Sequence, residues 1–312
     1  MALTITQADY LSNNDLQRGV AETIVKESPL LARFPWVEVI GNAFSYNREL
    51  ALPTVGFHPV GDTWTESTPT FTPISVSLKI LGGDADVDSF LAKTRRDTND
   101  LEAVTIESKA KAWAHTFEYT AVYGDASANV DEFSGLHRFI TGDATAQQVH
   151  AGSGSTGAAL TLAKLDEMID LIKPGKPDFL MMTRRTRRGL SAYGRTLTSP
   201  VNFSIDEFGH RIEYYDGIPI IINDHQLDTE TISSAAYALP TTGATSSVFA
   251  VKLGEEYVHG LNSGQLPTIE NIGQLETKDA TRTRVKGYVA LALRSPLAIA
   301  RLDGISSAAV TA

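Results

Sequence analysis

One long stretch of this 312-residue chain has the pattern of a single helix, and any fold must be built around it. Its apolar residues recur at steps of four, three, four and four, which places them on one stripe of a helix: Ile106, Ala110, Trp113, Phe117 and Ala121. Asn99 and Glu102 form a start that resembles a capping box, and Gly124 stands where a left-handed residue would end the helix. We expect a helix at 98–123, roughly 36 to 40 Å long, so other elements must lie across it.

The composition is that of an ordinary globular protein, with enough chain for two cores or for one core with large excursions. Of the residues, 42% are hydrophobic and 21% are charged, which excludes a disordered or low-complexity protein. The sequence contains no cysteine. Disulfides, thiolate metal sites and a cysteine nucleophile are therefore excluded, and the redox compartment stays open.

Charge and hydropathy exclude two further classes. The formal net charge of -10 argues against a protein whose main task is to grip nucleic-acid phosphates, because that task requires a clustered excess of Lys and Arg. The first residues lack a basic segment followed by an apolar run, and no window approaches about 18 uninterrupted apolar residues. We expect a soluble, non-secreted protein without a membrane span.

The region before the long helix predicts two extensions. Residues 1–36 have the pattern of a poorly packed arm with an amphipathic helix at 15–28. From residue 43 to about 80 the pattern has period two, and the residues that share its apolar face are Phe44, Tyr46, Arg48, Leu50, Ile74, Val76, Leu78 and Ile80. The two alternating runs predict a long hairpin.

The loop of about 20 residues between these runs is rich in Pro, Gly and Thr. Unstructured loops of this length are uncommon in compact monomers and are usually functional. Phe57, Trp64 and Phe71 lie near its tip, and aromatic residues on an exposed loop are favoured interface anchors. The hairpin therefore makes sense as an arm that lies on another subunit. The alternative is that the three aromatic side chains fold back onto their own domain.

After the long helix, helices and short strands alternate. We expect a helix at 162–172, a buried strand at 178–182, and a helix from the N-cap Thr183 to about residue 197. A hairpin with a turn at Asp216-Gly217 follows. Strands are expected at 248–252 and 281–293, the last beside the long helix. The fold class is α+β.

The run GSGSTG at 152–157 matches a dinucleotide-binding fingerprint. That fingerprint requires a buried strand before the glycines, and the preceding DATAQQVHA is too polar for one. A surface loop is the favoured interpretation.

Asp84, Asp86 and Asp88 have the one-three-five spacing of a calcium loop, but Ser89 and Arg95 stand where Gly and Glu are needed. A strand edge with one acidic face is favoured. The histidines form no HExxH motif, and no GxSxG elbow occurs. The sequence proposes no catalytic residue, metal ligand or cofactor.

The densest positive cluster is formed by Arg184, Arg185, Arg187 and Arg188, in the first turns of the helix that begins after Thr183. Positive charge there opposes the helix dipole, so we expect an acidic partner. An Asp or Glu of a neighbouring subunit is the first candidate. A solvated face and a nucleic acid are the alternatives.

The order of these elements resembles that of tailed-bacteriophage major capsid proteins of the Hong Kong 97 type. The phrases that resemble family patterns are FSGLHRFI, LAKLDEMIDLIKPGKPDFLMMTRRTRRGL, FGHRIEYYDGIPIIIND and VKGYVALALRSPLAIARLDGI. The resemblance covers nearly the whole chain, and its motifs are architectural. It implies a Hong Kong 97-like fold with an N-terminal arm at 1–39, an E-loop hairpin at 40–82, a P-domain at 83–135 and 268–295, and an A-domain at 136–267 and 296–312.

The resemblance implies a structural protein, not an enzyme, that assembles into hexamers and pentamers of an icosahedral head around double-stranded DNA without sequence-specific binding. Expected partners are other copies of the chain, a scaffolding protein, a portal and a decoration protein. The virion is the expected location, after assembly in the host cytoplasm. The candidate subunit-contact residues are Arg48, Glu49, Phe57, Trp64, Phe71, Arg184, Arg185, Arg187 and Arg188.

The sequence departs from some family members in two ways. Some members cross-link their shells through a lysine in the E-loop, and this chain has no lysine between Arg48 and Leu78. We therefore expect no such cross-link. Other members carry a scaffolding segment of about a hundred residues before the arm, so scaffolding here is expected from a separate protein or from a segment already removed.

Two other functions remain open. A cellular shell of the same fold, like an encapsulin, would load a protein cargo instead of DNA. An α/β enzyme would use the glycine-rich loop at 152–157 to bind a nucleotide.

Overall fold

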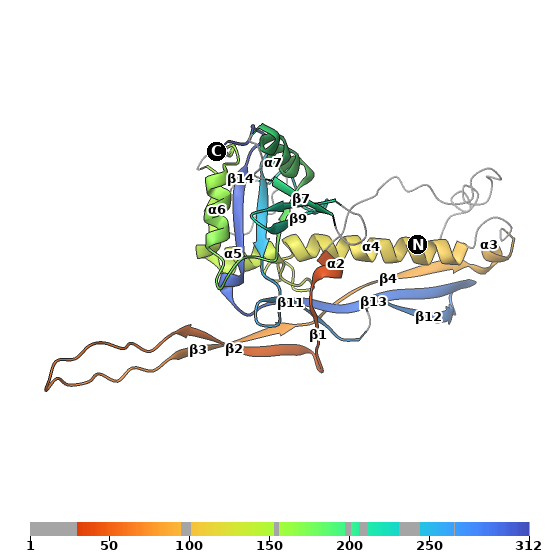
Figure 1. Cartoon of the computed structure of the whole chain (residues 1–312). Coiled ribbons are helices and arrows are strands. Elements are labelled where there is room, and N and C mark those ends of the chain that lie inside the picture. Colours follow the sequence, from red (N-terminus) through yellow and green to blue (C-terminus); the bar gives the residue numbers. More distant parts are fainter. Residues whose placement is uncertain are drawn as a thin grey trace.

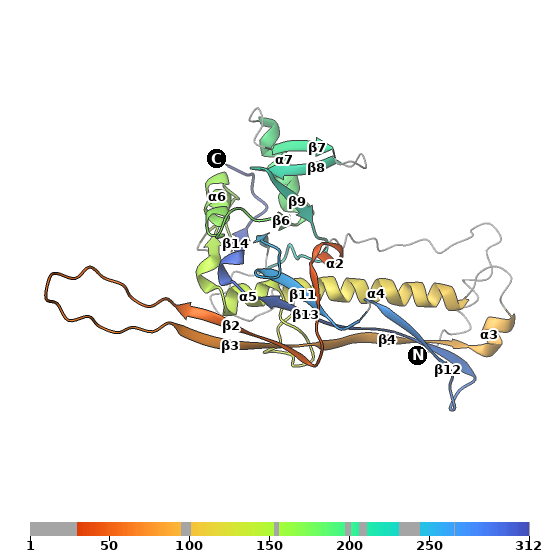
Figure 2. The same ribbon diagram turned by 60° about the horizontal axis from the view of Figure 1, so that its bottom comes forward.

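The computed structural model describes residues 30–94, 101–152, 156–196, 201–205, 211–230, 244–264 and 266–311. These residues form an elongated body along one long helix, a compact α/β body beside it, and a hairpin that projects beyond both (Figures 1 and 2). The elongated body contains α2 (Leu30–Arg33), β1 (Trp36–Glu38), β4 (Lys79–Asp88), α3 (Ser89–Thr94), α4 (Leu101–Tyr123), β11 (Val258–Asn262), β12 (Thr268–Gln274) and β13 (Ala280–Leu293).

The helix predicted from the apolar stripe is α4, which is 23 residues and roughly 34 Å long. Trp113, Phe117 and Ala121 are buried, whereas Ile106 and Ala110, nearer its first turn, are only partly buried. The predicted capping residue Asn99 lies outside the described residues. The stripe is therefore confirmed, most strongly over its second half.

Gly124 ends α4 for a reason other than the expected one. Its backbone is not in the left-handed region. A Cβ atom there would lie 2.3 Å from the carbonyl oxygen of Phe133 and 2.6 Å from that of Thr120. The prediction of a left-handed residue was wrong, and a close approach between backbone segments requires the glycine.

The strand β13 is the centre of the first sheet and was predicted to lie beside the long helix. It pairs antiparallel with β4 over its whole first part, from Ala280 to Val289, and with β12 over part of the same stretch. Because β4 and β12 pair with the same residues of β13, they lie on opposite sides of it. The final part of β13 pairs with β11, which pairs in parallel with β1. The Trp113 ring lies over Gly287, where a Cβ atom would come within 2.7 Å of the ring, so a side chain there would push the helix away.

The second sheet has the strand order β5-β14-β10-β6-β9-β8-β7. Its strands are β5 (Gln148–His150), β6 (Phe179–Met182), β7 (Val201–Ile205), β8 (Arg211–Tyr215), β9 (Ile218–Ile222), β10 (Ser246–Val251) and β14 (Ile299–Ile305). The associated helices are α5 (Leu136–Gly142), α6 (Leu162–Asp170) and α7 (Arg184–Thr196), with the 3-10 turns η1 (Thr145–Gln147) and η2 (Pro296–Ala298).

Alternation along β6 shows how this sheet is covered on both faces. Phe179 and Met181 belong to the core shared with α4 and α5, whereas Leu180 and Met182 belong to the core under α6 and α7. All four side chains are buried, as expected for a strand between two layers. The predicted strand at 178–182 is confirmed.

Local chemistry accounts for two predicted boundaries in this body. Asp216 and Gly217 have φ values of 48° and 78°, the conformation of a tight hairpin turn, and they join β8 to β9 as predicted. The Thr183 hydroxyl accepts a hydrogen bond from the amide of Thr186 at 3.3 Å and caps α7. The strands β7 and β14 were not predicted.

The expectation of a poorly packed arm is wrong for the part of residues 1–36 that the structure describes. Leu30 and Phe34 are buried in the main core, and the ring of Trp36 lies 5.6 Å from that of Phe117. The amide of Leu31 donates to the Glu118 carboxylate at 2.9 Å. The predicted helix at 15–28 lies outside the described residues.

Ile80 was expected on the apolar face of the hairpin, and it is 75% exposed. The chain leaves β3 after Ser77 and enters β4 at Lys79, so one residue lies outside either strand. Ile74, Val76 and Leu78 are partly buried, as expected for the apolar face. The next partly buried apolar side chain after Leu78 is Leu81 and not Ile80. Because strand alternation has period two, this single step reverses the face of every later residue.

Candidate assembly surface

The projecting hairpin consists of β2 (Ala43–Ala51) and β3 (Thr70–Ser77), which pair antiparallel from Ala43 opposite Ser77 to Ala51 opposite Thr70. Within the described residues these strands pair only with each other. The predicted long hairpin is therefore confirmed. It leaves the molecule at the end of the elongated body opposite to α3 and β12 (Figures 1 and 2).

Two polar side chains attach the base of the hairpin to the body. The Tyr46 hydroxyl donates to the carbonyl oxygen of Leu293 at 2.6 Å. The Arg48 guanidinium donates to the same oxygen at 2.6 Å and to the carbonyl oxygen of Arg294 at 3.0 Å. Arg48, a predicted subunit-contact residue, thus binds carbonyl oxygens of its own chain. Glu49, on the opposite face of β2, is exposed.

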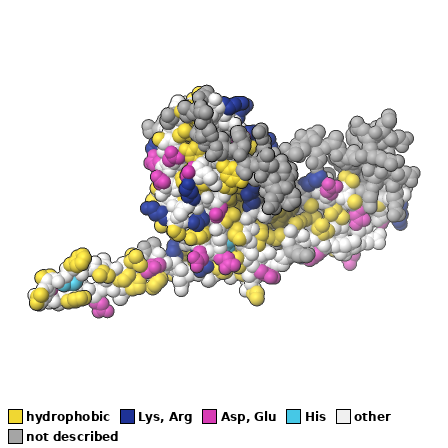
Figure 3. Space-filling model, viewed as in Figure 1, with side chains coloured by type: hydrophobic (Ala, Val, Ile, Leu, Met, Phe, Trp, Pro, Cys, Tyr) yellow, Lys and Arg dark blue, Asp and Glu magenta, His cyan; other side chains and the backbone are white. Residues whose placement is uncertain are grey.

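The tip of the hairpin carries the largest group of exposed apolar side chains in the described structure. Those at or near residues 52–69 are Leu52, Val55, Phe57, Val60, Trp64 and Phe71, with exposures from 59% to 108%. Yellow side chains accordingly cover much of the projecting hairpin in Figure 3. The alternative that Phe57, Trp64 and Phe71 fold back onto their own domain is excluded.

The tip has some local order of its own. The His58 ring stacks on Trp64 with 4.7 Å between ring centroids, and its Nδ1 lies 2.9 Å from the Asp62 carboxylate. The Ser67 hydroxyl donates to the carbonyl oxygen of Thr54 at 3.0 Å. These contacts shape the tip but leave its apolar side chains in water. An apolar surface of this extent is typical of a protein interaction site.

A second group of exposed apolar side chains, missed by the sequence analysis, lies at the other end of the elongated body. Phe90 on α3 is 67% exposed, and Ile269 and Ile272 on β12 are 52% and 47% exposed. The sequence signal that could have identified this group is the pair of isoleucines in β12, Ile269 and Ile272. Exposed apolar side chains thus occur at both ends of the long axis.

The arginine cluster of α7 finds acidic partners in the same chain. The Arg184 guanidinium donates hydrogen bonds to both carboxylate oxygens of Asp224, at 2.6 and 2.8 Å. Arg185 lies 3.2 Å from Asp228, and Arg187 lies 2.8 Å from Glu213. A neighbouring subunit is therefore not needed to compensate these three charges, contrary to expectation. Arg188 is exposed and forms no ion pair with another described residue.

The acidic residues with the spacing of a calcium loop lie on the strand β4, as the favoured interpretation predicted. Asp84 and Asp86 each bind an arginine of β13 with both oxygens, Arg284 and Arg282 respectively. These hydrogen bonds hold the pKa of both carboxyl groups below their usual range. The Asp88 carboxylate instead accepts the amide of Phe90 at 2.9 Å and caps α3. In the described part of the chain, no group of three or more metal-ligating side chains is placed to hold an ion.

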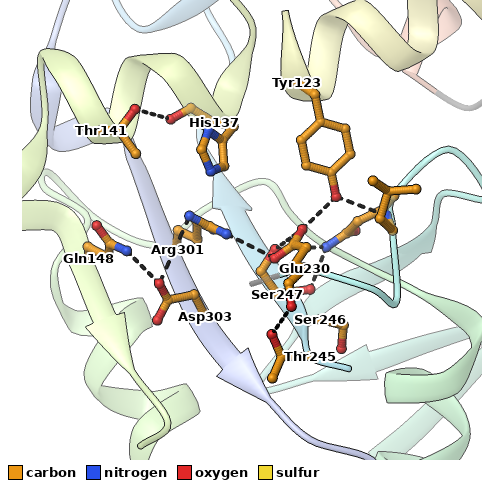
Figure 4. A network of polar contacts seen from close by, with 12 residues as sticks. Tyr123, His137, Thr141, Gln148, Glu230, Thr245, Ser246, Ser247, Arg301 and Asp303 are labelled. Atoms are coloured by element: carbon orange, nitrogen blue, oxygen red, sulfur yellow. Dashed lines mark hydrogen bonds and ion pairs between the residues drawn. The ribbon is translucent and has the colours of Figure 1, made fainter. Parts of the chain in front are cut away.

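A buried polar network joins the two bodies (Figure 4). Glu230 is 1% exposed, and it accepts hydrogen bonds from Tyr123 at 2.5 Å, Ser247 at 2.9 Å and Arg301 at 2.9 Å. Burial, reinforced by the Glu230 charge, raises the pKa of the Tyr123 hydroxyl. Asp303 accepts from Gln148 at 2.5 Å. Because donors occupy both carboxylates, this geometry supports packing between the end of α4 and strands β10 and β14.

His137 lies beside this network (Figure 4). Burial, with the nearby Arg301 charge, lowers the pKa of His137 to about 3, so its imidazole is neutral at ordinary pH. It therefore contributes no charge to the network.

The glycine-rich segment at 152–157 does not open a helix, since α6 begins at Leu162 after its N-cap Thr161. The short strand β5 precedes it at the edge of the sheet. Residues 153–155 lie outside the described chain. Among the described helices, none is long and apolar enough to cross a membrane.

Comparison with known proteins shows the fold. No protein-family model matches the sequence, and no similar curated protein was found. The SrpI encapsulin of Synechococcus elongatus PCC 7942 superposes with a TM-score of 0.70 at 18% identity, over 98% of this chain and 97% of that chain. The capsid of cyanophage A-1(L) gives a TM-score of 0.68 at 14% identity, over 97% and 100%. The capsid of the Myoviridae phage XM1 gives 0.62 at 14%, over 94% and 97%.

These matches cover nearly the whole chain, so the chain has the same fold as these encapsulin and capsid proteins. More narrowly, it is the α+β Hong Kong 97 fold of phage capsids, as the resemblance of the sequence implied.

Proposed function

We propose that this chain is a major capsid protein that assembles into hexamers and pentamers of an icosahedral phage head around double-stranded DNA. The observation that carries the proposal is the hairpin, which projects from the body and exposes the aromatic side chains at its tip. In water this surface is unfavourable, and in a lattice it becomes a contact. Head-to-tail contacts of this kind close into rings by rotation.

In this proposal the domains follow those expected from the sequence, with one revision. The N-terminal arm is 1–39, the E-loop is 40–82, the P-domain is built on α4 and β13, and the A-domain on the second sheet. The revision concerns β11, which was placed in the A-domain and pairs with β13. We therefore assign β11 to the P-domain.

The partners of such a subunit are other copies of itself, a scaffolding protein, a portal and a decoration protein. DNA would be enclosed without sequence-specific binding, consistent with the net charge of -10. The subunit would act as a structural component of the virion, assembled in the host cytoplasm, and not as an enzyme.

Negative-stain microscopy of the expressed full-length chain tests this proposal. We expect ordered particles, tubes or capsomers. A protein that remains a monomer at high concentration, with its hairpin protected from proteolysis, would contradict the proposal.

The second candidate is a nanocompartment shell, and the match to the SrpI encapsulin favours it. The content of particles purified from the native source discriminates the two functions. Nuclease-protected double-stranded DNA supports the phage head, and a stoichiometric cargo protein without DNA supports the compartment.

A further inference from the structure

A pocket of about 330 Å³ lies on the α/β body between α7 and the C-terminal segment at 305–310. One stripe of α7 lines it, at positions i, i+3, i+7 and i+10, with the residues Arg185, Arg188, Ala192 and Arg195. The small side chain of Ala192 between two arginines leaves the space open. Leu160, Ile305 and Val310 supply apolar lining.

The pocket is strongly basic. Its described lining contains three arginines and no acidic residue. Arg185 is partly neutralised by Asp228 at 3.2 Å. Arg188 and Arg195 are exposed and form no ion pair with another residue of the described chain. Two guanidinium groups of the pocket thus have no acidic partner among the residues that the structure describes, in a chain whose net charge is -10.

Hydroxyl groups complete the polar side of the pocket. Ser306 and Ser307 line it opposite α7. The Ser306 oxygen accepts the amide of Ala308 at 3.3 Å, so its own proton is free to be donated. Guanidinium forks and hydroxyl donors are the groups that recognise phosphoryl oxygens.

The pocket lies at one end of the second sheet. Strand β6 runs directly into α7 through Thr183, and β14 ends at Ile305 beside the pocket. Both strands are antiparallel to β10, so they run in the same direction. The pocket therefore lies between the end of β14 and the helix that follows β6.

We propose that this pocket binds a phosphorylated small molecule. Its phosphoryl oxygens would lie between Arg188, Arg195 and Ser306, and its organic part would cover the apolar lining at Leu160 and Val310. Arg188 and Arg195 are separated by about 10 Å along the helix axis, a span that two long side chains can close around two adjacent phosphoryl groups. Pyrophosphate is therefore the minimal probe. The inference is independent of the proposed role in a shell.

Isothermal titration calorimetry of the full-length chain with sodium pyrophosphate, at low ionic strength, tests the proposal. We expect saturable binding at one site, weakened at least tenfold in the double variant Arg188→Gln, Arg195→Gln. The double variant Arg33→Gln, Lys93→Gln removes the same net charge from exposed positions outside the pocket and should bind as the parent does. Replacement of Arg188 and Arg195 by Lys should give an intermediate affinity, because Lys keeps the charge but lacks the planar fork.

Three results would overturn the proposal. One is no saturable heat with the parent protein. Another is an equal loss of pyrophosphate affinity in both Gln double variants, which would indicate a general attraction between opposite charges. The third is binding of a single-stranded oligonucleotide, but not of pyrophosphate, through Arg188 and Arg195, which would make the surface a nucleic-acid contact. Circular dichroism of each variant verifies that the fold is intact.

Discussion

Glu118 illustrates how much the surroundings of one residue change its chemistry. Its side chain is fully buried in the C-terminal part of α4, and it accepts a hydrogen bond from the amide of Leu31 at 2.9 Å. Among the described residues it has no cationic partner. Burial therefore dominates and raises the pKa of Glu118 to about 7 from its ordinary value of 4.5.

The change Glu118→Gln should have an effect on stability that depends on pH. The folded state binds the Glu118 proton more tightly than the unfolded chain, so its contribution to stability is greatest below pH 4.5 and is lost as pH rises to about 7. The shift corresponds to about 3 kcal/mol. We expect Glu118→Gln to be nearly neutral at pH 4.5 and to raise the free energy of unfolding at pH 8.

Urea unfolding at the two pH values measures this difference. Glu66→Gln, at an exposed position of the hairpin tip, is the matched control and should change neither value. An effect of Glu118→Gln that is the same at both pH values would contradict the prediction.

The ion pair of Arg301 with Glu230 gives a second prediction at this scale. Both residues are buried, at 4% and 1% exposure, and their atoms are 2.9 Å apart. Arg301→Met removes one partner and leaves the Glu230 carboxylate uncompensated, which should lower the free energy of unfolding by about 3 to 5 kcal/mol. Thermal or urea unfolding measures this loss of stability. Arg33→Met, at an exposed position, should change stability by less than about 0.5 kcal/mol.

At the scale of elements, the hairpin combines a firmly attached base with an apolar tip that has no partner in its own subunit. Tyr46 and Arg48 fix its direction through the carbonyl oxygens at the end of β13. The sequence predicted the hairpin from its period-two pattern. Arg48 was also among the predicted subunit-contact residues. Only the fold shows that Arg48 reaches residues about 245 positions away within its own chain.

The change Trp64→Ala should leave the subunit folded and weaken assembly. Trp64 is 78% exposed, so its removal costs the isolated fold little, whereas its burial between subunits would stabilise the contact. We expect at least a tenfold rise in the protein concentration needed for particles, which corresponds to about 1.4 kcal/mol per contact. Light scattering with circular dichroism measures both properties.

Trp113→Ala provides the contrast. This ring is 5% exposed and lies between α4 and β13, so its removal should destabilise the fold by about 3 to 5 kcal/mol. Loss of folding in Trp64→Ala would contradict the prediction.

At the scale of the whole molecule, the proposed role as a shell subunit leads to the prediction that shells hold together without covalent links from the hairpin. No lysine occurs between Arg48 and Leu78, so the amine that such a link requires is missing from the hairpin. Denaturing electrophoresis of mature particles should show a single band at the mass of the subunit. A ladder of covalent multimers would contradict this prediction.

The sequence predicted the elements whose apolar residues recur with a clear helical or strand period, and it missed elements without such a period. The stripe on α4 and the alternation in β2 and β3 were sufficient, because each pattern places its apolar residues on one face. Strand β14 was missed although it is fully buried, since a short strand covered on both faces has no alternation to detect. The acidic partners of the α7 arginines were missed because they lie 26 to 43 positions along the chain, on loops and strands that only folding brings near.

The sequence by itself determined the long helix, the hairpin, the order of the elements and the absence of cysteine chemistry, because these depend on local periodicity and composition. The tertiary structure decided which apolar side chains stay exposed, which charges are paired within the chain and where a basic pocket opens. Those properties depend on contacts between segments that are distant in sequence, and local sequence patterns do not specify such contacts.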